Sequence, residues 1–305
     1  MQTRVIASSK EKLNLSICTT CKLLGLSRQV YYRAIKSTLK RKKTANSVLL
    51  LVDAIRIEMP RLGTRKLYHI LKGSLKELGV GRDALFRILK ANHRLIIPRK
   101  KYHVTTNSFH RFHKHKNKIE HLSIVKPEQV WVADITYVGQ RNNPMYLSLV
   151  TDAYSKKIQG YNVSDSLETV GSLKALKMAI KNRIYQQDEL IHHSDRGLQY
   201  CSDIYQKYIK NKKLLCSMTE SYDPYQNAVA ERVNGILKQE FLLTTKNIKL
   251  KTMQELVKQS VRIYNQKRPH LSSNMLTPEQ MHLQKSIKMK TYKTKNSRSF
   301  ETSGI

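Results

Sequence analysis

The sequence predicts an α/β domain that follows all-α units in the first hundred residues. Residues 129–138, QVWVADITYV, alternate apolar and polar side chains with a period of two, which is typical of a half-buried strand. Residues 82–91 instead place apolar side chains three and four positions apart, which is typical of an amphipathic helix. With 305 residues and 40% hydrophobic content, the chain is long and apolar enough for about two domains.

The first segment, residues 1–45, contains the outline of a helix-turn-helix. Gly25-Leu26-Ser27 is the predicted turn, and Ser27 is suited to cap the second helix. The apolar positions expected to join the two helices are Cys21, Leu24, Val30 and Tyr31. Arg28 and Arg33 would then be exposed on the second helix, where they can reach phosphates or base edges. The alternative is an ordinary helical hairpin with a basic face.

A second helix-turn-helix-like unit is predicted in residues 46–98, after the basic tract Lys40–Lys43. Its expected helices are Ser47–Glu58, Arg65–Leu75 and Arg82–Ala91, with a turn at Gly79-Val80-Gly81. The last helix has the arrangement of a DNA-recognition helix, because it exposes a basic edge opposite its apolar face. The residues of that edge are Arg82, Arg87 and Lys90.

The charge is distributed unevenly over the chain. The formal net charge is +34, with a pI of about 10.1, which favours a polyanionic partner. Residues 1–118 carry 28 Lys and Arg against 5 acids, residues 119–245 carry 15 against 14, and residues 246–305 carry 13 against 3. Two basic flanks therefore enclose a nearly neutral centre, which indicates that the flanks hold nucleic acid and the centre keeps carboxylates for another purpose.

Several classes of protein are excluded by the sequence pattern. The longest strongly apolar run, Val48–Val52, is far too short for a membrane span, so no membrane association is expected. The first residues lack the apolar core of a secretory signal, which predicts a cytoplasmic protein. Four cysteines are too few for a disulfide scaffold and should remain reduced there.

Residues 99–121 are predicted to be a basic, histidine-rich linker, and residues 284–305 a basic disordered tail. The linker histidines could hold zinc as an alternative, although no nearby pair of cysteines completes a four-ligand site. These histidines are His110, His113, His115 and His121. The segment between linker and tail, residues 122–283, is predicted to hold the α/β domain and C-terminal helices.

The α/β domain is expected to run in the order three strands, helix, strand, helix, strand, helix. The three adjacent strands suggest an antiparallel meander, and the amphipathic helix that follows fits a crossover. The expected strands are 129–138, 145–155, 157–164, 189–195 and 213–218, and the expected helices cover 167–184, 204–209 and the segment after residue 227. Trp131 lies three positions before Asp134, so alternation places it on the opposite face, in the core.

Three acids fall on or beside these elements: Asp134 in the first strand, Asp195 at the end of the fourth, and Glu231 early in the last helix. Carboxylates in rigid positions can hold two divalent cations for phosphoryl transfer, and Mg²⁺ prefers such oxygen ligands. Lys238 stands seven residues after Glu231 and therefore on nearly the same helix face, where it can contact the same substrate. Asp152 is interpreted as a hydrogen-bonding neighbour rather than a ligand, and His193 as a packing or orienting residue.

Three motifs resemble those of insertion-sequence transposases with a retroviral-integrase-like (DDE) catalytic core. They are WVADITY (131–137), HSDRGLQY (193–200) and NAVAERVNGILK (227–238), and 35 residues separate Asp195 from Glu231. This spacing, together with Lys238, is similar to the D-D-(35)-E pattern of that superfamily. YNQKRPH (264–270) and TPEQ (277–280) resemble the C-terminal signature of the OrfB-like type, which is translated from a second reading frame.

The resemblance implies a ribonuclease-H-like fold, with a five-stranded mixed sheet and helices on both faces. It implies a metal triad of Asp134, Asp195 and Glu231, holding Mg²⁺ or Mn²⁺, for strand cleavage and strand transfer at the ends of an insertion element. It also implies that residues 219–229, TESYDPYQNAV, form the mobile loop of integrase cores.

The expected partners are element-end and target DNA, a second copy of the chain on DNA, and an upstream-frame transposase subunit. The expected location is the bacterial cytoplasm, with nucleoid association when DNA is bound. Two alternatives remain open: a non-catalytic helix-turn-helix DNA-binding regulator derived from a transposase, and a nuclease of the same fold.

Overall fold

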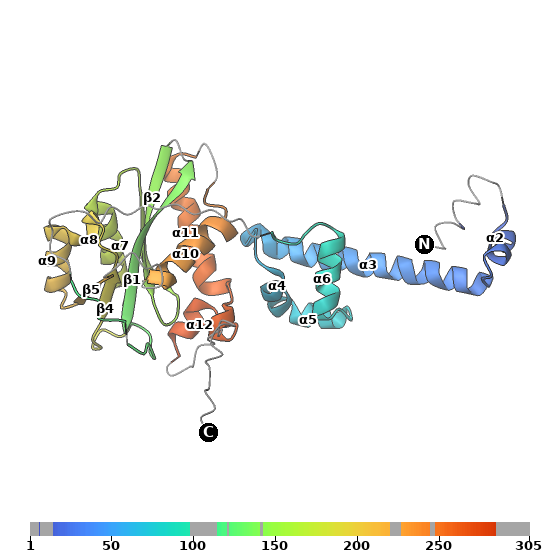
Figure 1. The fold of residues 1–305 in the computed structure, drawn as a ribbon, viewed down its shortest axis with the longest axis horizontal. Helices are drawn as coiled ribbons and strands as arrows, with labels where there is room; N and C mark the ends of the chain where they lie inside the picture. Colours follow the sequence, from blue (N-terminus) through green and yellow to red (C-terminus); the bar gives the residue numbers. More distant parts are fainter. Residues whose placement is uncertain are drawn as a thin grey trace, which may run out of the picture. The chain divides into compact units, whose positions relative to one another are not determined.

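The computed structural model of the chain divides into two compact units (Figure 1). The helical unit comprises residues 1–57 and 67–95, and the core unit comprises residues 58–66 and 96–305. The structure describes residue 6 and residues 15–97, 115–120, 122–140, 143–219, 227–244 and 248–284. Most of the predicted linker, most of the predicted mobile loop and nearly all of the predicted tail lie outside the described residues. No helix in the described ranges has the length and hydrophobicity of a membrane span.

The first helices of the chain are α2 (Ile17–Leu23) and α3 (Arg28–Glu58). The predicted turn between them is present: Gly25 has a φ of +65°, and Ser27 Oγ accepts a hydrogen bond from the Val30 amide at 3.3 Å. Cys21 and Tyr31 are buried between the two helices, as expected. Leu24 and Val30 are instead 40% and 46% exposed, so their predicted core positions are wrong. The contact between the two helices is smaller than predicted, and the partly buried Leu26 and Ile35 pack against Cys21 and Tyr31 in it.

One long helix replaces two predicted pieces. α3 runs without a break for 31 residues, so the predicted helix start at Ser47 and the predicted boundary between residues 45 and 46 fall inside it. The basic tract Lys40–Lys43 consists of straight-chain residues with high helix propensity, which explains why the helix continues through it. The predicted helix Arg65–Leu75 is divided at Leu71 into α4 (Thr64–Ile70) and α5 (Lys72–Glu77).

The predicted recognition helix is present with its predicted bounds, as α6 (Arg82–Ala91). Leu85 and Leu89 are fully buried on its apolar face. The basic residues Arg82, Arg87 and Lys90 are exposed, as the sequence pattern predicts. Arg82 Nε lies 2.9 Å from Asp83 Oδ1 in an exposed ion pair.

The core unit confirms the predicted order of strands and helices. Its strands are β1 (Val130–Gln140), β2 (Asn143–Asp152), β3 (Ile158–Ser164), β4 (Ile191–Ser194) and β5 (Leu215–Met218). Its helices are α7 (Thr169–Lys181), α8 (Leu198–Cys201), α9 (Asp203–Asn211), α10 (Ala228–Glu240), α11 (Leu250–Lys267) and α12 (Pro278–His282). The short helix α8 was not predicted, because four residues are too few for a helical period to be visible.

The five strands form one mixed sheet in the order β3-β2-β1-β4-β5. β1, β2 and β3 pair antiparallel as the expected meander, whereas β4 is parallel to β1 and β5 is parallel to β4. The five-stranded mixed sheet that the family resemblance implies is therefore confirmed. β1 lies at its centre, between β2 and β4, so it is the most enclosed strand.

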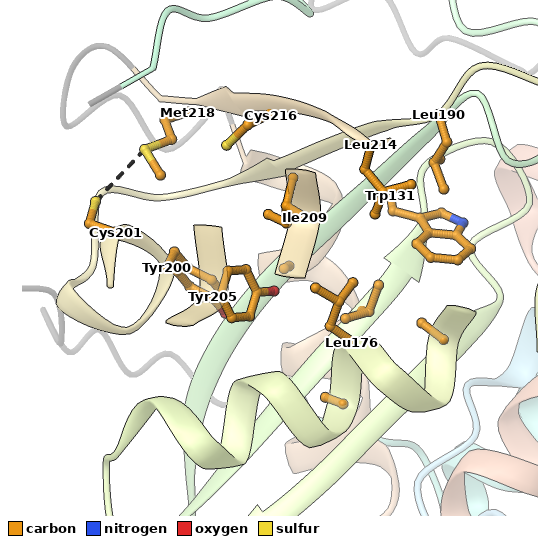
Figure 2. Close-up of a cluster of buried hydrophobic side chains, with 14 residues drawn as sticks. Trp131, Leu176, Leu190, Tyr200, Cys201, Tyr205, Ile209, Leu214, Cys216 and Met218 are labelled. Carbon is orange, nitrogen blue, oxygen red and sulfur yellow. Dashed lines mark hydrogen bonds between the residues drawn. The ribbon is translucent and has the colours of Figure 1, made fainter. Parts of the chain in front are cut away.

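The two faces of β1 are covered by different helices. Trp131 and Ala133 belong to a buried cluster with residues of α7, α8 and α9, including Leu176 and Tyr205 (Figure 2). Val130 and Val132 point to the other face and pack with Ala230 of α10. Asp134 is the next residue in this second series, so it faces α10, and the predicted core position of Trp131 on the opposite face is confirmed.

One glycine is required by the close approach of a helix to the sheet. A Cβ atom at Gly160 of β3 would lie 2.0 Å from the carbonyl oxygen of Ala175 and 2.6 Å from the amide nitrogen of Ala179. Both atoms belong to the backbone of α7, so neither can move aside without displacing the helix. Gly160 therefore sets the distance between β3 and α7.

A buried ion-pair network joins the C-terminal ends of α10 and α11. Arg268 is 1% exposed and makes two parallel hydrogen bonds to Glu240, from Nε to Oε2 at 2.8 Å and from Nη2 to Oε1 at 2.7 Å. Its Nη1 lies 2.9 Å from His270 Nε2. Lys66 Nζ contacts the same carboxylate at 3.2 Å. The last residue of α10 is thus fixed to the YNQKRPH segment and to residues 58–66.

Candidate active site

Asp134 lies in the middle of β1 and faces α10. Its Oδ2 accepts a hydrogen bond of 2.6 Å from Asn234 Nδ2, and its Oδ1 accepts one of 2.9 Å from the Ile135 amide. Burial and, after it, the negative charge of Asp195 raise the pKa of Asp134 to about 7, with a smaller contribution from the charge of Glu231. The two hydrogen bonds act in the opposite direction, because they stabilise the ionised form.

Asp195 follows β4, which lies parallel to β1 with Ser194 opposite Ala133. The next residue of each strand is an aspartate, so the register places Asp134 and Asp195 next to each other. Both line one pocket, together with Tyr146, Gly197 and Tyr200 among others. Asp195 Oδ1 accepts a 3.1 Å hydrogen bond from the Gly197 amide, which holds the carboxylate at the start of α8. The structure therefore brings two of the three predicted carboxylates together.

Glu231 does not join this pair. It lies exposed in the first turn of α10 and lines a separate groove with Arg232, Gly235 and Gln239 among others. Partial burial raises its pKa. Within the described residues, no three His, Cys, Asp or Glu side chains meet closely enough to hold a metal ion. Mutual repulsion favours such separation of carboxylates, and a divalent cation offsets that repulsion.

Lys238 lies on the same side of α10 as Glu231, because seven helical steps return almost to the same direction. Its Nζ donates a 2.7 Å hydrogen bond to Thr136 Oγ1, two residues beyond Asp134 on the same face of β1. Burial lowers the pKa of Lys238, and the charge of Asp134 opposes this shift. The predicted basic residue is thus located beside the predicted carboxylate.

Asn234 is a site residue that the sequence reasoning missed. It is buried, and its side-chain amide donates the short hydrogen bond to Asp134. A signal was present in the sequence, since Asn234 is a polar residue between Val233 and Ile236 on the helix that carries Glu231 and Lys238. Asn227, at the N-terminus of the helix, makes no side-chain cap and instead donates to the Ala133 carbonyl at 3.4 Å.

Two neighbouring titratable residues have structural partners. Asp152 is fully buried and accepts hydrogen bonds from the Glu128 amide at 2.6 Å and from the amide and hydroxyl of Ser155, each at 2.7 Å. His193 is fully buried, and its Nδ1 lies 2.9 Å from Ser217 Oγ. Both arrangements agree with the hydrogen-bonding and packing roles that the sequence favoured.

The predicted DNA contacts of the N-terminal segments lie in the helical unit. Arg28 and Arg33 are exposed on α3, and the basic edge of α6 is exposed as described above. The alternative zinc site is only partly described: His115 Nε2 lies 3.0 Å from Gln206 Oε1, whereas His110, His113 and His121 lie outside the described residues.

Comparison with known proteins places the core in a defined class. Two descriptions of an integrase core domain match the chain, one over residues 125–224 and one over residues 212–278. The matched regions contain all three predicted carboxylates. The catalytic core domain of HTLV-2 integrase, solved with magnesium, is 20% identical and has a TM-score of 0.41, covering 52% of this chain and 97% of that one.

Two sequence relatives come from Shigella sonnei. An uncharacterized 31 kDa protein of insertion element IS600 is 31% identical over 264 residues, which cover 85% of this chain and 95% of the relative. The transposase of insertion sequence IS629 is 40% identical over 113 residues, which cover 37% of this chain and 38% of that protein. The chain belongs to the insertion-sequence transposases with an integrase-type core, a family of nucleotidyl-transfer enzymes.

Proposed function

We propose that this chain cleaves DNA strands at the ends of an insertion element and transfers them to target DNA, with divalent cations held by Asp134, Asp195 and Glu231. Strand cleavage and transfer is the general activity of the family. The observation that carries the proposal is the shared pocket of Asp134 and Asp195 at adjacent parallel strands. α10 supports it, because it brings Lys238 to the same face of β1 and carries Glu231 on the same side.

The carboxylate oxygens of the pocket suit Mg²⁺, and Mn²⁺ accepts the same ligands. Such ions, when bound, activate a water or a DNA 3′-hydroxyl and stabilise the leaving oxygen. The groups around the pocket position the carboxylates and the DNA. Asn234 orients Asp134, the Gly197 amide orients Asp195, and the ammonium of Lys238 attracts a DNA phosphate toward them.

In this proposal the basic helices α3 and α6 bind the DNA. Arg82, Arg87 and Lys90 contact DNA from α6, and Arg28 and Arg33 contact it from α3. Two element ends must be held together during transposition, so at least two copies of the chain act on one DNA complex. A subunit translated from an upstream reading frame is a further proposed partner.

A direct test uses the full chain, Mg²⁺ and labelled DNA that carries candidate element ends. We expect both nicked strands and joined products, and no reaction in EDTA. Cleavage that persists in EDTA would contradict the metal site. Cleavage without joined products, including with pre-cut ends, would favour a nuclease, and DNA binding without either product would favour a regulator.

Replacing Asn234 with Leu should lower the cleavage rate by about 10- to 100-fold, because residues that orient a metal ligand commonly contribute that much. The substitution removes the hydrogen bond to Asp134 but keeps a similar volume inside α10. Cleavage rates at saturating Mg²⁺ measure the effect, and thermal melting reports any loss of folding. The control is Asn211→Leu at the exposed end of α9, which should keep the wild-type rate.

Replacing Arg82, Arg87 and Lys90 together with Ala should weaken DNA binding and lower the slope of log affinity against log salt by about 3. Each phosphate contact that is lost reduces the number of counterions that the DNA releases when the protein binds. Titrations at several NaCl concentrations measure the slope. The control variant replaces Lys207 and Lys210 of α9 and Lys212 directly after it with Ala, which removes the same number of exposed charges. An equal change in the salt slope of both variants would show that α6 has no special role.

A further inference from the structure

One face of α3 is exposed along almost its whole length. Its members recur at intervals of three and four residues: Tyr32, Lys36, Leu39, Lys43, Asn46, Leu50, Ala54 and Ile57. The four large apolar residues among them are 55%, 61%, 72% and 83% exposed, in chain order. Seven and eleven helical steps of about 100° bring these four to within about 20° of one direction, so they form a single stripe.

The contacts that α3 makes inside the helical unit use other directions. Val48 and Val52 are fully buried and point about 160° away from the stripe. Nearer the start of the helix, Tyr31 and Ile35 pack with Cys21 of α2. Large apolar side chains that remain exposed in a row commonly mark an interaction surface. We call the eight exposed residues the α3 stripe.

We propose that the α3 stripe binds the α3 stripe of a second copy of this chain, with the two helices antiparallel. Leu39 is seven positions after Tyr32, and Ile57 is seven positions after Leu50, so the apolar pattern reads the same from both ends. A twofold dimer needs this property, because each residue that contacts a second residue must be contacted by it in return. Tyr32 then lies opposite Ile57 of the second copy, and Leu39 opposite Leu50.

The polar members of the stripe fit the same register. Lys43 lies at the level of Asn46 of the second copy, and a polar layer in the middle of a helix pair fixes its register. Lys36 lies at the level of Ala54, whose small side chain leaves room for the aliphatic stem of the lysine. The spacing of three and four residues is that of helices that pack side by side along their length.

Charge opposes this pairing in dilute salt. The tract Lys40–Lys43 lies near the centre of the pair, so two copies bring two such tracts together. Salt screens the repulsion, with a Debye length of about 3 Å at 1 M, and a DNA polyanion neutralises it. The inference rests on the proposed function in one respect, because a pair that DNA strengthens can hold two element ends. The interface itself is testable without DNA.

Cysteine cross-linking tests the antiparallel register in the full chain. Leu39→Cys and Leu50→Cys are made separately in a Cys18→Ser background, and each protein is oxidised alone and in an equal mixture in 1 M NaCl. We expect a disulfide-linked dimer in the mixture only. In the antiparallel pair two copies of residue 39 are about 16 Å apart along the axis, beyond the reach of a disulfide. Cross-links in each protein alone, or in no sample, would overturn the proposal.

Sedimentation provides the second measurement, under reducing conditions in 1 M NaCl. The wild-type chain should sediment as a dimer of twice its 35.5 kDa mass, and Leu39→Gln with Leu50→Gln should sediment as a monomer. Gln keeps helix propensity while removing apolar surface. The control is Val30→Gln, which is 46% exposed on the opposite face of α3 and should leave the dimer intact.

A monomeric wild type, or equal loss of the dimer in the control, would contradict the α3 stripe. Failure of the proposed function would look different. A wild-type chain that dimerises through the stripe but neither cuts nor joins DNA would contradict the proposed catalysis and leave the interface standing.

Discussion

The substitution Asp134→Asn should reduce Mg²⁺-dependent cleavage and joining by at least about 1,000-fold, which corresponds to about 4 kcal/mol of transition-state stabilisation. The amide removes one negatively charged ligand from the pocket that Asp134 shares with Asp195. The folded protein should remain at least as stable as wild type at pH 8. The raised pKa of Asp134 shows that the folded state disfavours its ionised form, and Asn carries no charge.

Product formation with labelled element ends and thermal melting at pH 8 measure the two effects. Asp203→Asn, at the exposed start of α9, makes the same chemical change outside the pocket and should keep both properties. An Asp134→Asn protein that cuts DNA at more than about a tenth of the wild-type rate would refute the assignment. Glu231→Gln should be equally inactive. If it stays active while Asp134→Asn does not, the third ligand is another residue.

The fold was predictable wherever one period dominated a whole element. The apolar spacing of α6 arises from one buried face, so the sequence alone indicates its type and bounds. The period of two identified residues 129–138 as a strand, although helices cover both faces of β1 and the strand runs from Val130 to Gln140. The continuity of α3 was not predictable in this way. Its first half buries little apolar surface, and propensity through Lys40–Lys43 decides the outcome, which is a weaker signal than a period.

The candidate site was predictable in part for a different reason. Motif spacing located Asp134 and Asp195, and the parallel pairing of β1 with β4 explains why residues 61 positions apart share a pocket. The position of Glu231 on the flank of α10 does not follow from spacing, because it depends on how the helix packs on β1. The role of Asn234 requires a contact across 100 residues of sequence, which no local pattern contains.

The ion-pair network around Arg268 was not predictable from the sequence either, because Glu240 and Lys66 lie 28 and 202 residues away from Arg268 along the chain. Burial acts to raise the pKa of Glu240, but the hydrogen bonds and the positive charge of Arg268 lower this pKa below its usual value. Burial and the charge of Arg268 together lower the pKa of Lys66 to about 8. One carboxylate thus balances two buried cations, and the neutral His270 accepts a hydrogen bond from Arg268 Nη1.

Arg268→Met should therefore destabilise the core unit by about 3 kcal/mol, because removing one partner of a buried pair leaves the other charge poorly compensated. Met keeps most of the apolar volume, so the loss reports the ion pair rather than a cavity. We choose the lower end of the usual range because Lys66 still contacts Glu240 at 3.2 Å. For a unit of this size the melting temperature should fall by about 6–12 °C, measured by calorimetry.

Lys267→Met provides a matched control one residue earlier in the chain. Lys267 Nζ pairs with Glu58 Oε1 at 2.6 Å, but both side chains are largely exposed, at 53% and 41%. Water already solvates these charges, so the loss of this pair should cost less than about 1 kcal/mol. Equal destabilisation by both substitutions would show that the buried Arg268–Glu240 pair contributes no more to stability than the exposed Lys267–Glu58 pair. A stable Arg268→Met protein would mean that the other contacts of α10 with β1, which are its apolar face and the hydrogen bonds of Asn227, Asn234 and Lys238, are sufficient to hold the helix.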